Sequence, residues 1–283
     1  MSMPTISPLP GPFGAVVSDA NVRDGLDGSL SEQLQHALAE HRILVLDNQN
    51  LTDAEFAKFS RIWGEPIEYF SARDRDNAVP EVIIISNTAK TPERLRDGAM
   101  HWHQDSSYED PPAAVTMLSA IEAPEGRNET LFADVTAAFE SLPVEQQVEL
   151  ASLHVVHDRR GCPAELLFPG ERRGDGAPEA TPVTHPLVAT HPVSGRQALY
   201  GIAGTPVGIV GMDDDKAFEL LTGLKKHALS PKFRQAATAA VGNILVWDNL
   251  AVMHCATETE YSDEPGRRRL VRRISTKLAA PLV

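Results

Sequence analysis

The sequence is poor in cysteine, in positive charge and in long apolar runs. Only Cys162 and Cys255 are cysteines among 283 residues, too few for a disulfide framework, so a reducing, cytoplasmic location is expected. The 26 basic residues are outnumbered by 39 acidic ones, which gives a formal net charge of −13. That charge argues against a general binder of nucleic acids or anionic membranes. No apolar run is long enough for a membrane span, and the first residues lack the features of a signal peptide.

An internal repeat of fixed period is also missing, while the overall composition is that of an ordinary globular protein, 42% hydrophobic and 23% charged. A β-rich unit of this length is often a single domain, so residues 1–283 are expected to form one. Three polar stretches are expected to leave the core as loops, at about 67–80, 88–100 and 158–183, and the last of them resembles a lid.

Apolar spacing predicts both helices and strands. A helix is expected over 30–41, a second begins at the capping-box pattern Thr52–Glu55 with Phe56, Phe59 and Trp63 on one face, and a third begins at Asp213. A short helix is expected near 137–141. The strands are expected at 42–46, 82–85, 114–121, 130–135, 153–157, 187–191, 198–200, 244–247 and 269–277. This alternation of a β-rich core with flanking helices indicates an α+β protein.

The densest set of metal-binding side chains lies between residues 99 and 108. In an extended segment, residues two apart point to the same face, so His103 and Asp105 could reach one ion while Gln104 faces away. His101 is the rival ligand, since it also lies two residues from His103. The order Trp-His-x-Asp favours His103, and His101 is expected beside the site or facing solvent.

A third ligand is expected from far along the chain. The apolar strand 244–247 runs into a Trp-Asp-Asn turn and then presents a single histidine, His254. Two imidazoles and one carboxylate form the facial triad of non-heme Fe(II) oxygenases, which leaves metal positions open for substrate and oxygen. The sequence therefore predicts a metal site at His103, Asp105 and His254.

A basic strand follows that histidine. In a strand, Arg269, Val271 and Arg273 share one face, whereas Arg268 and Arg272 share the other with Leu270 and Ile274. Arginines that face inward need anionic partners, but a basic run can equally be a solvated surface. The alternation alone leaves open which face is inside.

These motifs together resemble the taurine/2-oxoglutarate dioxygenase (TauD/TfdA) family, which includes the 2,4-dichlorophenoxyacetate dioxygenases. The resemblance covers most of the chain and rests on the segments WHQD, WDN…MH and RR followed three residues later by R. It implies a double-stranded β-helix (jelly-roll) fold that uses Fe(II), 2-oxoglutarate and O2. Position by position, it implies iron ligands at His103, Asp105 and His254, and binding of the distal carboxylate of 2-oxoglutarate by Arg269 with Thr130.

The substrate implied by this resemblance is a small organic anion, a carboxylate or sulfonate, and Arg273 matches an arginine near the substrate acid group. The polar loop containing Tyr69, Phe70 and Arg73 could add an aromatic wall and a second cation. Neither nucleic acid nor membrane is expected as a partner. A homo-oligomer, either a dimer or a tetramer, is left open.

Two other classes of function fit part of the pattern. A zinc-dependent hydrolase on the same scaffold could use the same ligands, since Zn2+ also binds histidine and aspartate and activates water, but Arg269 and Thr130 would then have no role. A metal-free jelly-roll binding protein would make the histidines structural. Trp247 is expected in the core, and a structural role is expected for the remaining histidines His154, His157, His185, His191 and His227.

Overall fold

Three apolar runs form the middle of the largest sheet. The strand Ile43–Leu46 and the strand Ile244–Asp248 are buried at every position, and Ala113–Glu122 is buried over its first eight residues. The sequence of a strand is a continuous apolar run when both faces of the strand are covered by other parts of the protein. One face of this sheet is covered by helices and the other by a second sheet, so these runs lie at the centre of the protein.

The computed structural model describes residues 4–23, 28–68, 78–89, 91, 99–124, 129–171, 180–279 and 282. Its strands are β1 (Thr5–Pro8), β2 (Ala15–Ser18), β3 (Ile43–Leu46), β4 (Ile83–Ser86), β5 (Ala113–Glu122), β6 (Glu129–Asp134), β7 (His154–His157), β8 (Val183–Pro186), β9 (Val188–Thr190), β10 (Gln197–Leu199), β11 (Pro206–Ile209), β12 (Arg234–Thr238), β13 (Ile244–Asp248), β14 (Val252–Ala256) and β15 (Leu270–Lys277). Its α-helices are α1 (Gly28–His41), α2 (Asp53–Ser60), α4 (Val135–Glu140), α5 (Val144–Leu150) and α6 (Asp214–Ala228), and its 3-10 helices are η1 (Arg61–Trp63), η3 (Ala164–Leu166) and η4 (Pro231–Phe233).

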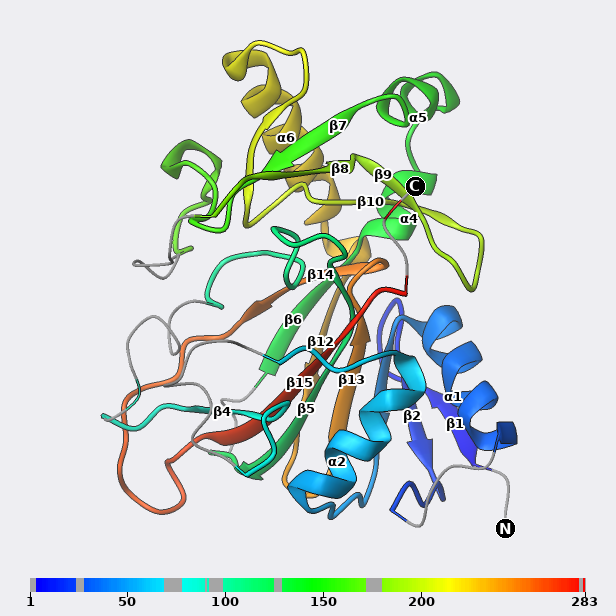
Figure 1. Ribbon diagram of the computed structural model, residues 1–283, viewed down its shortest axis with the longest axis vertical. Helices are drawn as coiled ribbons and strands as arrows, with labels where there is room; N and C mark the ends of the chain where they lie inside the picture. The colour runs from blue at the N-terminus through cyan, green and yellow to red at the C-terminus, as the bar shows by residue number, and fades with distance from the viewer. Residues whose placement is uncertain are drawn as a thin grey trace.

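Two sheets form the core expected of a jelly roll. The larger has the strand order β1-β2-β3-β13-β5-β15-β4, and the smaller has the order β12-β6-β14. Strands far apart in sequence are neighbours in both sheets, as where β15 pairs with β5 or β14 with β6 (Figure 1). Apolar side chains of both sheets, including Phe132, Trp247 and Val271, form one cluster between them. The fold is the predicted α+β jelly roll.

Helices α1 and α2 cover the outer face of the larger sheet. The predicted capping box is present: the Thr52 hydroxyl accepts from the Glu55 backbone N–H, and the Glu55 carboxylate accepts from the Thr52 N–H. The prediction that Trp63 lies on this helix is wrong, because α2 ends at Ser60 and Trp63 belongs to η1. Its ring still packs edge-on against Phe59, with the two ring centroids 5.1 Å apart.

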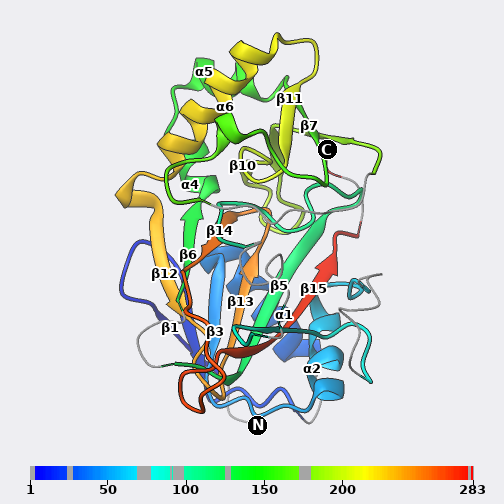
Figure 2. The ribbon, with the colours of Figure 1, turned by 90° about the vertical axis from the view of Figure 1, so that its left-hand side faces the viewer.

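A second layer of short strands and helices lies beyond one end of the two sheets (Figure 2). It contains β7 to β11 together with α4, α5 and α6. The strands predicted at 187–191 and 198–200 are confirmed as β9 and β10, which pair antiparallel as a hairpin, and α6 begins after Asp213, which caps it. Helix α5 was not predicted, and its apolar residues Val144 and Val148 are exposed, so it lacks the buried face that produces a helical apolar pattern.

Two predicted strand ends are wrong for local reasons. Arg42 was placed in a strand, but its φ of 68° belongs to a turn and β3 begins one residue later. Val135 was placed at the end of another strand, but it begins α4, because the Asp134 carboxylate accepts from the Ala137 N–H and caps that helix.

No helix among the described residues is both long and apolar enough to cross a membrane.

The described part of the expected lid is fixed by a buried ion pair. Lys225 Nζ on α6 lies 2.5 Å from Glu171 Oε2, and both side chains are almost fully buried. The other Glu171 oxygen accepts from the Trp102 N–H at 2.7 Å. One carboxylate therefore links α6, the segment after η3 and the residue before His103. Residues 172–179 of the predicted excursion lie outside the described residues.

We expect the substitution Lys225→Met to lower the free energy of unfolding by about 3–5 kcal/mol, because it leaves the Glu171 carboxylate buried without its cation. The matched control is Arg196→Met, which breaks a pair with Glu140 that is 37% and 45% exposed and is expected to cost at most about 1 kcal/mol. Urea denaturation of both variants measures the difference. Equal losses would mean that the buried pair is no more stabilising than the exposed one.

Candidate metal centre

The backbone brings two of the predicted ligands together. The His103 N–H donates to the His254 carbonyl at 2.9 Å, and the His254 N–H donates to the His103 carbonyl at 2.8 Å. The Ala256 N–H likewise donates to the Ala99 carbonyl. The segment before Asp105 therefore lies along β14 and adds a short bridge to the smaller sheet. This pairing places the two imidazoles side by side, with their ring centroids 4.2 Å apart.

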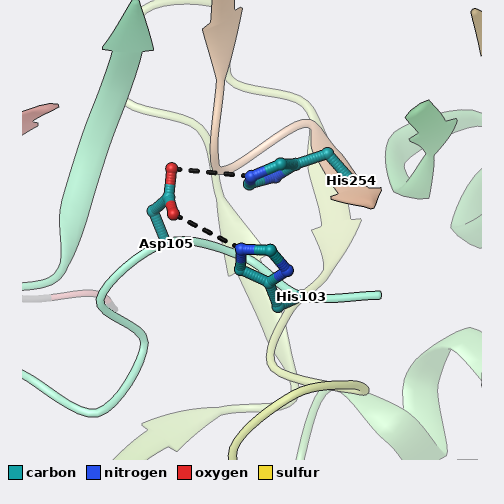
Figure 3. A group of neighbouring side chains, drawn as sticks. All are labelled: His103, Asp105 and His254. Carbon is teal, nitrogen blue, oxygen red and sulfur yellow. Dashed lines mark ion pairs between the residues drawn. The ribbon is translucent and has the colours of Figure 1, made fainter. Parts of the chain in front are cut away.

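The third side chain faces both rings from one side (Figure 3). Figure 3 shows the Asp105 carboxylate directed at both imidazoles, with Oδ1 3.6 Å from His103 Nε2 and Oδ2 3.7 Å from His254 Nε2. The three donor atoms all lie within 4.8 Å of one another. Two bonds of about 2.0–2.2 Å to one ion span roughly 4 Å. Each of these carboxylate–imidazole distances is therefore short enough for one shared metal ion.

Asp105 and His254 are in the protonation states that metal binding needs, an ionised carboxylate and a neutral imidazole. Burial alone would raise the pKa of the Asp105 carboxyl, but the Arg273 guanidinium and the imidazoles outweigh it, and the pKa lies well below its usual value. Burial, together with the neighbouring His103, lowers the pKa of His254. His103 Nδ1 lies 2.8 Å from the His101 carbonyl, and donation to that oxygen leaves Nε2 free to bind a metal.

Packing fixes the rings where hydrogen bonds do not. His254 Nδ1 is buried without a hydrogen-bond partner, but the ring lies against Trp247 and Phe132, at centroid distances of 4.7 and 6.1 Å. Gly204 packs on the first ligand: its φ is +89°, and a Cβ there would lie 2.6 Å from His103 Cβ. Any larger residue at Gly204 would displace that histidine.

A polar network behind Asp105 holds the carboxylate in place. The Thr116 hydroxyl donates to Asp105 Oδ2 at 2.7 Å and lies 2.8 Å from the Ser275 hydroxyl. Asn249 Oδ1 accepts from the Trp247 indole N–H and from the Asp105 backbone N–H, and its amide donates to Thr116. Sequence reasoning did not assign roles to these residues. The Trp-Asp-Asn turn was the available signal for Asn249, whereas nothing in the sequence singles out Thr116.

Strand β15 supplies the cationic side of the site. Arg273 Nη2 lies 2.7 Å from Asp105 Oδ1, and Val271 and Ser275 on the same face are buried against the second sheet and Thr116. The face of Arg269 and Arg273 is therefore the inner one. Arg269 lies just before the strand, and burial lowers the pKa of its guanidinium to about 10, so it stays charged at neutral pH.

The other predicted site residues have different outcomes. Thr130 is buried on β6, two positions from Phe132 and so on the same face of the strand. His101 is buried beside the candidate ligands, with its ring centroid 4.8 Å from that of His103, and its backbone carbonyl lies 2.8 Å from His103 Nδ1. Tyr69, Phe70 and Arg73 lie outside the described residues.

Comparison with known proteins supports this geometry. The model of the family described as "Taurine catabolism dioxygenase TauD, TfdA family" matches residues 5–274, nearly the whole chain. The chain belongs to the TauD/TfdA family. Pentalenolactone F synthase from Streptomyces arenae is 32% identical, over 95% of this chain and 94% of that protein. The alpha-ketoglutarate-dependent 2,4-dichlorophenoxyacetate dioxygenase from Cupriavidus pinatubonensis is 29% identical, over 95% of this chain and 96% of its own.

A solved TauD/TfdA-like structure matches from end to end. The crystal structure of AAD-2 in complex with Mn(II) and N-oxalylglycine superimposes with a TM-score of 0.79 and 25% identity, over 100% of both chains. The present protein is accordingly a 2-oxoglutarate-dependent non-heme iron dioxygenase that uses Fe(II), 2-oxoglutarate and O2. None of the relatives named here is a hydrolase, and nothing in them supports the zinc-dependent alternative.

We expect His103→Ala, Asp105→Ala and His254→Ala each to weaken Fe(II) or Mn(II) binding by about a hundredfold or more, because three ligands are the minimum for a facial site. Calorimetric titration of the metal measures the affinity, and circular dichroism checks that the fold remains. His101→Ala is the matched control and should bind metal almost normally, since His101 contacts His103 through its backbone carbonyl. Loss of binding in His101→Ala with normal binding in His103→Ala would reverse the assignment.

Proposed function

We propose that the enzyme hydroxylates a small organic anion, most simply a carboxylate with an apolar body, such as an aryloxyalkanoate. The observation that carries this proposal is the contact between Arg273 and Asp105. It places a guanidinium directly beside the metal ligands, where the reacting part of a substrate would lie. A fixed positive charge at that point favours an anionic group on the substrate, because opposite charges attract more strongly where water is largely excluded.

In this proposal His103, Asp105 and His254 hold the iron, and Arg269 with Thr130 binds the distal carboxylate of 2-oxoglutarate. Two features support the second assignment. Desolvation lowers the pKa of Arg269 only to about 10, so the guanidinium keeps its charge at neutral pH, and a planar guanidinium can form two parallel hydrogen bonds with a carboxylate. Thr130 is buried on the smaller sheet and could donate its hydroxyl hydrogen to the same group.

The remaining residues position the reaction and exclude water. With 2-oxoglutarate and O2, the iron supplies the oxidant that converts a substrate C–H bond to C–OH, with release of succinate and CO2. The Thr116–Asn249 network fixes the orientation of Asp105, and Trp247 and Phe132 shield His254. These contacts hold the ligand set rigid, so that substrate position decides which bond is oxidised.

The substrate end is proposed from charge and from the relatives. The 2,4-dichlorophenoxyacetate dioxygenase is named for a carboxylate with an aromatic body, which fits an arginine that faces the metal. Arg73 with Tyr69 and Phe70 remains our proposal for the far wall of the substrate pocket. Sulfonates keep the same negative charge and are the second class to test.

We also propose that the chain is one cytoplasmic catalytic domain. The candidate ligands come from positions 103 to 254 and the two arginines from positions 269 and 273, so a division of the chain anywhere between residues 105 and 269 would split the site. Cys162 and Cys255 are both buried and form no disulfide, which suits a reducing compartment. The acidic net charge disfavours nucleic acid as a partner.

We expect Arg269→Ala to raise the concentration of 2-oxoglutarate needed for half-maximal turnover by about a hundredfold, since losing a two-point contact with a buried carboxylate costs a few kcal/mol. Arg269→Lys should recover only part of this loss, because an ammonium cannot form the parallel pair. Arg267→Ala is the control, since that neighbouring side chain is 75% exposed. An unchanged 2-oxoglutarate requirement in Arg269→Ala would show that this arginine does not bind it.

The substrate class is tested by succinate release with Fe(II) and 2-oxoglutarate. Carboxylates, sulfonates, sulfates and phosphonates with an apolar body are compared with uncharged and cationic analogues of the same size. We expect anions alone to stimulate the wild type, and Arg273→Ala to lose most of that stimulation, about tenfold or more, because the pairing cation is gone. Metal affinity is measured in the same variant, since Arg273 also contacts Asp105. Stimulation by neutral compounds only, or equal stimulation of both proteins, would refute an anionic substrate.

A further inference from the structure

We propose that Asn87 is the positioning residue for Arg269, because it fixes the backbone from which that guanidinium extends. This inference rests on the proposed role of Arg269 in binding 2-oxoglutarate. Asn87 immediately follows β4 and is only 2% exposed. It was not among the residues that the sequence singled out, and it has no charge of its own to contribute to the site.

The contacts with Arg269 involve both of its backbone polar groups. The Asn87 N–H donates to the Arg269 carbonyl at 3.1 Å, and the Arg269 N–H donates to Asn87 Oδ1 at 2.7 Å. One residue therefore binds the donor and the acceptor of the other. Side-chain hydrogen bonds of this kind replace a strand partner where the ladder itself has ended.

The ladder is weakest at this point. Leu270 pairs with Ser86 on β4, which is the last pair on that side. On the other side, the register of β15 against β5 shifts between Leu270 and Val271. Regular pairing therefore does not fix Arg269, which lies one residue before the strand. The two bonds to Asn87 extend the β4–β15 ladder by one residue and supply the missing constraint.

The remaining polar groups of Asn87 hold the segment that leads into Arg269. Its Nδ2 donates to the Glu260 carbonyl at 2.7 Å and to the Arg267 carbonyl at 3.2 Å, and its own carbonyl accepts from the Ser262 N–H at 3.2 Å. An asparagine side chain offers one acceptor and two donors. Aspartate would instead present a negative oxygen to two carbonyl oxygens, which repels them.

A second anchor of the same segment is on the surface. Arg268 forms two hydrogen bonds with Glu122, at 2.7 and 3.0 Å, but these side chains are 37% and 32% exposed. Exposed ion pairs contribute little to stability. Of these two anchors, the buried bonds of Asn87 are therefore the stronger constraint on the backbone at Arg269, and the Glu122 pair offers a control one residue away.

The experiment measures binding without turnover. The protein is loaded with Mn(II), which binds the same donor types, and 2-oxoglutarate is titrated into it by calorimetry. We expect Asn87→Ala to weaken 2-oxoglutarate binding by about tenfold, as expected for one or two lost hydrogen bonds, with Mn(II) affinity unchanged. Asn87→Asp keeps the acceptor for the Arg269 N–H and should lose about threefold. Glu122→Gln should bind 2-oxoglutarate as the wild type does.

A double-variant cycle separates positioning from general destabilisation. If Asn87 acts through Arg269, Asn87→Ala adds little once Arg269→Ala has removed the guanidinium. Unchanged binding in Asn87→Ala, a full tenfold loss on top of Arg269→Ala, or an equal loss of Mn(II) affinity would each overturn the inference. Should the alanine variant not fold, Asn87→Asp decides by the same criteria. If Arg269→Ala alone leaves 2-oxoglutarate affinity unchanged, the proposed role of Arg269 fails, and the positioning role fails with it.

Discussion

The candidate metal centre depends on one pair of backbone hydrogen bonds, those that His103 and His254 exchange. They join a loop between β4 and β5 to a strand near the other end of the chain. Without these bonds, nothing in the backbone would direct the two imidazoles at one ion. Strand β14 is itself held by β6, where His254 lies opposite Phe132. The smaller sheet therefore holds both histidines in fixed positions. On the other side of the loop, Glu171, which is paired with α6, accepts a hydrogen bond from the Trp102 N–H.

Burial of a carboxylate is the second constraint, and it explains residues that have no direct part in metal binding. Asp105 is removed from water, so its negative charge needs compensation before a metal arrives. Arg273 supplies a positive charge and Thr116 a hydrogen bond. The Thr116 hydroxyl is held in position for this hydrogen bond by its own hydrogen bonds with the Asn249 amide and the Ser275 hydroxyl. Such a network is stabilising when every member is paired, which ties the geometry of the metal site to β5, β13 and β15 together.

Local sequence signals predicted much of the core and the identity of the candidate ligands. Apolar runs located β3, β5 and β13, and the capping box located the start of α2, because these depend on neighbours within a few residues. The sequence did not predict three features: the turn at Arg42, the exposed helix α5 and the hydrogen bonds between Asn87 and Arg269. Each depends on backbone geometry or on partners far along the chain, and such partners leave no periodic pattern. The candidate ligand triad was predicted because His-x-Asp, a distant histidine after an apolar strand and a basic strand occur together, as the family resemblance implies.

Strand β15 shows why its inner face could not be identified from the sequence. On the metal side Arg273 meets Asp105, and on the helix side Arg272 binds Asp53 and the Ser119 hydroxyl, at 3.1 and 2.8 Å. Each face of the strand carries an arginine paired with a carboxylate, so the alternation of apolar and polar residues does not distinguish the inner face from the outer one. The two arginines differ in their partners alone. Arg272 meets a helix N-terminal carboxylate, which is structural, whereas Arg273 meets a carboxylate that faces two imidazoles. The contact with Asp105, which is one of the candidate metal ligands, identifies the inner face of β15 as the face of the reaction site. The arginine alone does not identify it.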